Sequence, residues 1–118
     1  MEERRKVERF PMLLQVRWET AHGASSGVIL NGSAGGCFVR TRTDDPGDDP
    51  LRLEIRLPGG ERLSLWGEVT YYLPTEGFGL QFIGSPDDGS SSNDLWLEHL
   101  ALLKSGAPVR SERELVSA

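Results

Sequence analysis

The sequence has few residues that could form covalent cross-links or hold a metal. Its 118 residues include one cysteine, Cys37, and two histidines, His22 and His99. A single cysteine cannot form an internal disulfide, and it excludes zinc sites that use several cysteines. With so few cysteine and histidine residues to bind a metal, we expect neither a metal nor a cofactor. A chain without disulfides is typical of a reducing compartment, and we expect a cytoplasmic location.

Long apolar stretches and an excess of positive charge are also lacking. The longest apolar run, 10–14, is far shorter than the roughly 20 residues of a membrane-spanning helix. The first ten residues, MEERRKVERF, lack the apolar region of a secretory signal, so we expect no membrane insertion. With 13 basic and 18 acidic residues the net charge is −5, which disfavours a nucleic-acid partner. The same acidic balance counts against a small barrel that binds single strands.

Glycine and proline are abundant, and the 14 glycines and seven prolines predict many turns between short strands. Residues 12–19 and 51–57 alternate apolar and polar side chains, as strands with one buried face do. Four more strands are predicted at 28–30, 37–41, 63–73 and 78–82. Apolar residues at helical spacing over 95–103 predict a helix that begins at residues 92–94 and ends at Gly106. The sequence therefore predicts an all-β fold, a six-stranded antiparallel β-barrel with a C-terminal α-helix.

The length fits one domain with three parts. Residues 1–10 are predicted to form an N-terminal arm that carries arginines, because proline at position 11 disfavours a continuing helix. Residues 11–104 are expected to form the barrel and its closing helix, and residues 105–118 a C-terminal tail for which disorder is one expectation. Within the barrel, residues 21–27 are expected to be a turn or short loop and residues 31–36 a tight connection.

The alternation also predicts which side chains face the core. Trp18 is expected inside the barrel. In the fifth strand Gly67 lies among apolar residues of one parity, which suggests a bulge or a close backbone approach. Trp66 and Tyr72 have the opposite parity, and they form a partner surface or lie under the helix. The apolar residues that share one face of this strand are Leu63, Leu65, Val69, Tyr71 and Leu73.

Two polar segments carry a recognisable spacing. Arg5 and Arg9 lie four residues apart in the arm, and Asn31, Ser33 and Gly36 follow the next strand. In this order they resemble the two-part signature RxxxR and (D/N)xSxxG of the PilZ domain, the bacterial receptor module for cyclic di-GMP. The run GFGLQF at 77–82 looks like the glycine–phenylalanine strand near the end of that family's barrel. The resemblance covers roughly residues 4–104.

The resemblance implies a cyclic di-GMP site built from the arm and the loop. Arginine offers a planar fork that fits phosphate oxygens and the O6 and N7 atoms of guanine, and the ligand has two of each group. Asn31 and Ser33 would meet a guanine edge, and Gly36 would let the backbone approach closely. Gly35 would adopt a positive φ. A basic residue at the position of Arg4 is associated in the family with a stacked pair of ligands. The implied ligand-binding residues are Arg4, Arg5, Arg9, Asn31, Ser33, Gly35 and Gly36.

Each half of the signature also has a simpler interpretation. The arginines of the arm would be solvated charges interleaved with Glu2, Glu3 and Glu8. Asparagine, serine and glycine are ordinary turn residues. Asn31 stands where aspartate is the alternative, and an amide has one acceptor oxygen and no charge, which implies a lower affinity.

No catalytic motif is present: the sequence has no GxSxG elbow, HExxH, phosphate-binding loop or GxGxxG. Cys37 and His99 are expected to be packed, so we predict no catalytic residues and no enzyme. The resemblance implies a receptor that couples cyclic di-GMP binding, by ordering its arm, to an unidentified effector protein in motility or surface behaviour. The alternative is a PilZ-like protein-interaction module that binds cyclic di-GMP weakly or not at all.

Overall fold

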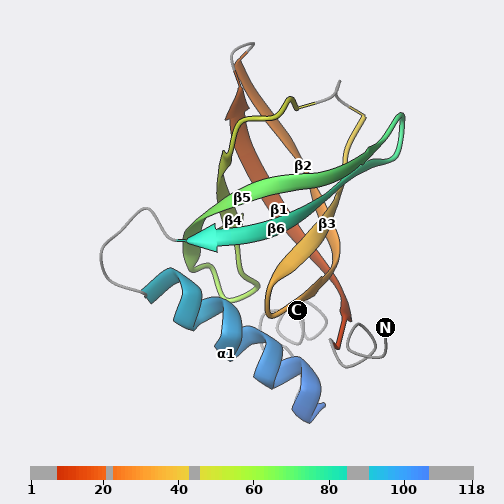
Figure 1. Cartoon of the computed structure of the whole chain (residues 1–118). Helices are drawn as coiled ribbons and strands as arrows, with labels where there is room; N and C mark the ends of the chain where they lie inside the picture. Colours follow the sequence, from red (N-terminus) through yellow and green to blue (C-terminus); the bar gives the residue numbers. More distant parts are fainter. Residues whose placement is uncertain (1–7, 21–22, 43–45, 85–90, 107–118) are drawn as a thin grey trace, which may run out of the picture.

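Six antiparallel strands form a closed barrel in the order β1-β2-β3-β6-β5-β4, and one helix lies across an end of it (Figure 1). The computed structural model describes residues 8–20, 23–42, 46–84 and 91–106. This architecture confirms the predicted fold class. The elements are β1 (Phe10–Thr20), β2 (Gly23–Ser33), β3 (Gly36–Arg40), β4 (Leu51–Arg56), β5 (Arg62–Leu73), β6 (Gly77–Gly84) and α1 (Ser91–Ser105).

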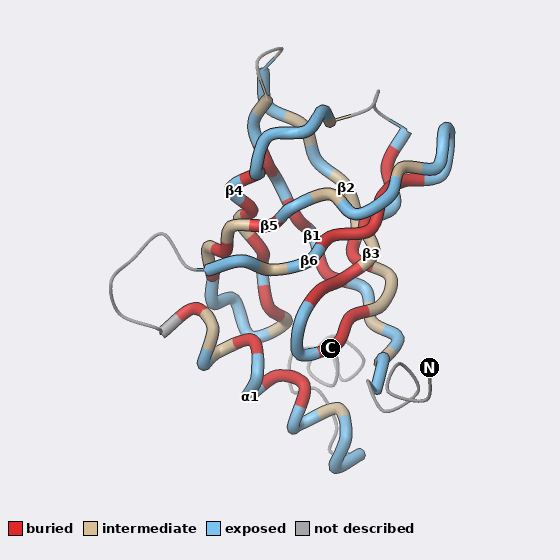
Figure 2. Tube along the Cα trace, in the orientation of Figure 1, coloured by how far each residue is buried: buried red, intermediate tan, exposed pale blue. Residues whose placement is uncertain are grey.

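The barrel interior is filled by the alternating apolar residues of the strands. In β1, Leu14, Val16 and Trp18 are buried, whereas the intervening Leu13 is 78% exposed. The same alternation runs through β4, as the red and blue segments of the tube show (Figure 2). Trp18 packs edge-on against Phe78 across the core, with ring centroids 5.2 Å apart. The two strands with clean alternation were therefore predicted correctly, and Trp18 is a core residue.

The strand β2 is longer than predicted at both ends. It pairs with β1 from Thr20↔Gly23 onward, so residues 23–27 belong to the strand and not to a turn. At its other end β2 continues to Ser33, and the expected connection of residues 31–36 shrinks to Ala34 and Gly35. The small residues of 23–27 carry no apolar alternation, and they are held in the sheet by the backbone bonds of β1.

Bulges in the β5–β6 ladder change which aromatic side chains face outward. Its pairing with β6 shifts between Trp66 and Gly67 and again between Val69 and Tyr71. The first shift confirms an irregularity beside Gly67, although its extra residue, Ile83, lies in β6. The second reverses the parity beyond it, so Tyr72 packs against the core and Tyr71 is exposed. The prediction that Tyr72 faces outward was therefore wrong, because a bulge moves each later side chain to the other face.

The helix α1 closes the end of the barrel where β1 begins and β6 ends (Figure 1). Trp96 is fully buried and packs edge-on against Phe82, with ring centroids 5.2 Å apart. The Ser92 hydroxyl accepts a hydrogen bond from the Ser64 backbone N–H at 3.0 Å. Gly106 has a φ of 78°, which suits the residue after a helix end.

His99 is packed against the barrel, as predicted. It is 6% exposed, and burial lowers its pKa while Glu61 opposes this shift with a smaller raising effect. Among the residues that the structure describes, no helix is long and apolar enough to cross a membrane.

Candidate ligand site at the β2–β3 hairpin

The barrel brings the start of β1 next to the β2–β3 hairpin. Phe10 pairs with Gly32 and Pro11 pairs with Asn31. Continued by one residue, this antiparallel register places Arg9 level with Ser33. The second arginine of the RxxxR spacing and the NxSxxG segment therefore lie side by side. Arg4 and Arg5 lie outside the described residues, as does most of the predicted arm of 1–10.

Ser33 links the hairpin to the helix. It is 3% exposed, and its carbonyl oxygen accepts a hydrogen bond from the Trp96 Nε1–H at 2.8 Å. Its hydroxyl oxygen accepts a bond from the Gly35 N–H at 3.3 Å. A hydroxyl that accepts a bond keeps its own proton to donate. Ser33 therefore stabilises the turn and anchors α1.

Gly36 allows a close approach of two strands. It pairs with Gln81 of β6, and a Cβ at position 36 would collide with the Leu80 carbonyl oxygen. The close approach expected at this glycine is thus made to the barrel itself. A Cβ at position 35, by contrast, would meet no atom within 4 Å. The φ of Gly35 is not positive, so the positive φ expected there was wrong. In a connection of two residues, the backbone closes the turn without it.

Asn31 is the signature residue whose polar group is not satisfied within the barrel. Its Oδ1 atom is buried and accepts no hydrogen bond from any described residue. A buried acceptor without a donor costs about 1–3 kcal/mol. Gly32, the next residue, faces Trp96, so the side chains of Asn31 and Ser33 lie on the opposite face of the strand.

Positive charge reaches the hairpin from Arg9. Burial raises the pKa of the Cys37 thiol to about 12, and the charge of Arg9 opposes that shift. Cys37 pairs with Gly32, so the field of Arg9 extends to the signature strands. Glu8, the residue before it, forms an ion pair with Lys104 of α1 at 3.2 Å. This glutamate of the arm is therefore paired with a lysine of the helix.

Two groups beside the hairpin were not singled out as site residues from the sequence. Phe38 pairs with Asn31 and stacks on Tyr71, with centroids 6.2 Å apart and ring planes at 22°. Trp96 was recognised only as part of a helical stripe, and its bond to Ser33 spans 63 positions of sequence. No local spacing signals either contact, since both depend on strand register.

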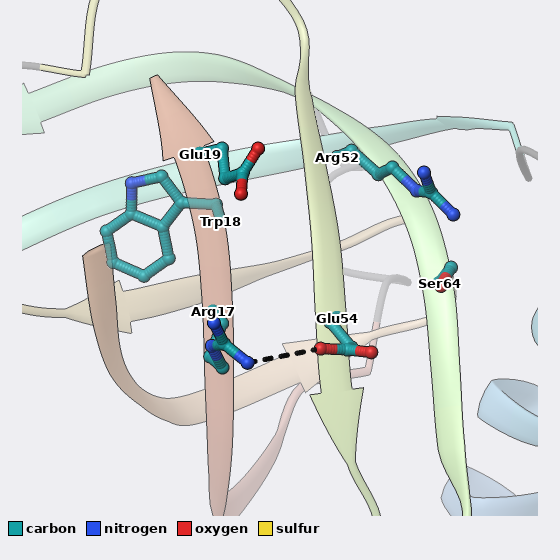
Figure 3. Close-up of a pocket in the computed structure, with 6 residues that line it drawn as sticks. All are labelled: Arg17, Trp18, Glu19, Arg52, Glu54 and Ser64. Carbon is teal, nitrogen blue, oxygen red and sulfur yellow. Dashed lines mark ion pairs between the residues drawn. The ribbon is translucent and has the colours of Figure 1, made fainter. Parts of the chain in front are cut away.

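Other parts of the described structure offer different chemistry. Residues 8–20, 23–42, 46–84 and 91–106 contain no cluster of histidine, cysteine and acidic side chains that could hold a metal ion. A groove of about 270 Å³ lies elsewhere, on the outer wall of β1, β4 and β5 (Figure 3). It does not include any residue of the signature.

A family model of the PilZ domain matches residues 3–96. This chain belongs to the PilZ domain family. The match includes both halves of the signature and extends over all six strands into α1. No curated protein matches the sequence.

Two solved structures share the fold. The Bacillus subtilis inhibitor of motility (MotI/DgrA) superimposes with a TM-score of 0.67 at 18% identity, over 86% of this chain and 51% of the other. This chain thus spans about half the length of that protein. The PilZ domain of CeSA from a cellulose-synthesizing bacterium superimposes with a TM-score of 0.60 at 22% identity, over 82% of this chain and 98% of that domain. At these identities the likeness concerns the PilZ fold.

Proposed function

We propose that this PilZ domain is a cytoplasmic receptor for cyclic di-GMP that passes ligand binding on to an effector protein. The observation that carries the proposal is the buried, unpartnered Oδ1 of Asn31, next to the segment with Arg9. Ser33 and Gly36 have roles within the barrel, whereas Asn31 has an acceptor that the described structure leaves unused. Membership of the PilZ family supports the same ligand.

The chemistry of cyclic di-GMP fits these groups. The amide oxygen of Asn31 can accept one hydrogen bond from the N–H donors of a guanine, and the Ser33 hydroxyl has a proton left to donate. Arg9 can bind a phosphate or a guanine edge through its planar fork, and Arg5 would add a second fork. Gly35, with open space around it, leaves room beside the turn for a ligand.

The contacts of α1 suggest how binding would be transmitted. The helix is tied to the hairpin through Trp96 and to the arm through the ion pair of Lys104 with Glu8. Ordering of the arm over a ligand would compete with that ion pair and change the surface near α1. The shift is driven by the difference in ligand contacts between the two arrangements. The effector remains to be identified; the name of one structural neighbour, an inhibitor of motility, makes motility control the first pathway to test.

Titration calorimetry with cyclic di-GMP tests the proposal. We expect Arg5→Ala, Arg9→Ala and Asn31→Ala each to weaken binding by about tenfold or more, because a good bidentate or buried contact contributes about 1–3 kcal/mol. Arg17→Ala is the control. It removes an exposed arginine of β1 and should leave the affinity unchanged. Added salt should weaken binding, because exposed phosphate contacts are screened.

Thermal unfolding of the same variants separates a ligand residue from a turn residue. Asn31→Ala removes an unsatisfied acceptor, so its melting temperature should equal or exceed that of the parent protein. A residue kept only for turn chemistry would lose stability instead. Absence of heat with cyclic di-GMP at high micromolar concentration would overturn the receptor and favour the second candidate, a protein-interaction module. That candidate is supported by the structural roles of Ser33 and Gly36.

A further inference from the structure

The outer wall of β1, β4 and β5 carries a concentration of positive charge. Its exposed arginines, which we name the arginine face, are Arg17, Arg52, Arg56 and Arg62. The acidic side chains on the same three strands are Glu19, Glu54 and Glu68, fewer than the arginines. This is the reverse of the whole chain, whose net charge is −5.

Two of these arginines face each other directly. In the β4–β5 ladder Arg56 pairs with Arg62, and on its other side Arg56 pairs with the neutral Gln15. Directly opposite side chains in a sheet lie about 5 Å apart at their Cβ atoms, and like charges at that position repel. Among the described residues, neither arginine forms an ion pair. The fold itself therefore gains nothing from this pairing of charges.

The neighbouring part of the wall is hollowed into the groove seen in Figure 3. Arg17 and Glu54 face each other there across β1 and β4, at 3.8 Å, and Arg52 lies beyond them toward β5. Arg52 pairs across the ladder with Trp66, which is half-buried. Arg52 forms no ion pair within the described residues. The lining residues are Arg17, Trp18, Glu19, Arg52, Glu54 and Ser64.

We propose that the arginine face binds an acidic, extended segment of a partner protein. Charge complementarity identifies the occupant, since the exposed guanidinium groups outnumber the carboxylates. Arg52 and Arg56 are four residues apart on one strand, about 13 Å, and carboxylates four residues apart in an extended segment have the same spacing. Most of the side chains that line the groove are charged, so recognition depends on ion pairs with them.

The arginine face is a separate surface from the candidate ligand site. Arg17 pairs with Ser26, toward the opposite end of the β1–β2 ladder from Phe10 and Gly32. Binding at one surface can therefore be measured without occupying the other. Two further anions could compete for the face: a simple polyphosphate, and the exposed Asp48 and Asp49 of a second copy of this chain.

Fluorescence anisotropy with a labelled oligo-glutamate peptide tests the proposal at low salt. We expect the peptide to bind the full chain, and a matched oligo-glutamine peptide not to bind. The double variant Arg56→Glu/Arg62→Glu should weaken binding by about tenfold or more, because two charge-assisted contacts become repulsive. The double variant Arg40→Glu/Arg42→Glu changes the net charge equally but alters exposed arginines outside the face, so it should change affinity less than about twofold.

Four outcomes would overturn the proposal. Equal losses in both double variants would assign binding to net charge alone. If inorganic triphosphate displaces the peptide at an equal concentration of negative charge, the face binds simple anions. Binding to vesicles of phosphatidylglycerol in preference to the peptide would assign it to a membrane surface. Sedimentation showing self-association that Arg56→Glu/Arg62→Glu abolishes would assign it to a second copy. Circular dichroism checks the fold, and the single variant Arg52→Glu provides an independent measurement of the same loss.

Discussion

The β2–β3 hairpin and the arginine face use polar residues in opposite ways, although both are built on β1. At the hairpin, Ser33 and Gly36 are buried and each has a contact within the barrel that explains it. On the arginine face, Arg56 and Arg62 are exposed, unpaired within the described residues and opposed to each other. A motif residue can therefore be retained for packing as well as for a ligand. A surface charge that satisfies nothing in the fold is the better indication of a partner.

The same distinction separates residues within the hairpin. Ser33 fixes the turn and the helix, whereas the unpartnered acceptor of Asn31 contributes nothing to either. The comparison requires that the hairpin be stabilised by its packing against α1 and β6. Substitutions at this end of the barrel test that requirement.

The largest effect is expected where the helix meets the hairpin. Trp96→Ala removes a fully buried indole that packs on Phe82 and bonds to Ser33. We expect a loss of about 3–5 kcal/mol in the free energy of unfolding, because truncation of a large buried ring leaves a cavity. Urea unfolding followed by circular dichroism measures it.

The conservative variant Trp96→Phe divides this loss into two parts. It keeps most of the ring and removes the indole N–H, which leaves the Ser33 carbonyl without that donor. We expect a smaller loss than for Trp96→Ala. If Trp96→Ala unfolds at the same urea concentration as the parent protein, α1 does not secure the hairpin, and the contrast with the arginine face disappears.

The next largest effect on stability is expected at two adjacent glycines of the β2–β3 hairpin. Gly36→Ala places a Cβ against the Leu80 carbonyl oxygen of β6, and we expect a loss of about 1–3 kcal/mol from overpacking. Gly35→Ala, the matched control, meets no atom within 4 Å and has no left-handed φ. It should be neutral or raise stability by about 0.4–1 kcal/mol, because alanine restricts the unfolded chain.

Thermal melts of these two variants decide the prediction. The expected order of melting temperatures is Gly35→Ala at or above the parent protein and Gly36→Ala below it. The opposite order would mean that the hairpin is held by Gly35, and that the contact of Gly36 with β6 is not a structural requirement.

The elements that the sequence predicts well are those whose side chains alternate. The patterns of β1 and β4 place Leu14, Val16 and Ile55 inside, and the structure agrees. The first half of β2 consists of glycine, alanine and serine, which indicate a loop, and pairing with the backbone of β1 makes it a strand. The second bulge in β5 leaves no mark in the sequence, so Tyr72 was assigned to the wrong face.

The sequence predicts which residues belong to the candidate site, but it does not predict their contacts in space. The order of the two motifs identified the hairpin and the segment before β1, which the register then brought together. Spacing could not show that Ser33 bonds to Trp96, or that the Oδ1 atom of Asn31 lacks a partner among the described residues, because both facts depend on contacts distant in sequence. Nothing in the sequence singles out Arg56 and Arg62, which only the β4–β5 register places opposite each other.

The smallest expected effect concerns that opposed pair. Arg62→Glu and Arg56→Glu each replace a repulsive cross-strand pair by an attractive one, so each should raise the free energy of unfolding by about 0.2–1 kcal/mol. The double variant restores like charges, now negative, and should return stability toward that of the parent protein. Urea unfolding of all four proteins at low salt measures the coupling, and added salt should reduce it. If the single variants are no more stable than the parent protein, Arg56 and Arg62 do not repel each other in the folded barrel. The opposed pair would then no longer indicate an acidic partner, because there would be no repulsion between the two arginines for that partner to relieve.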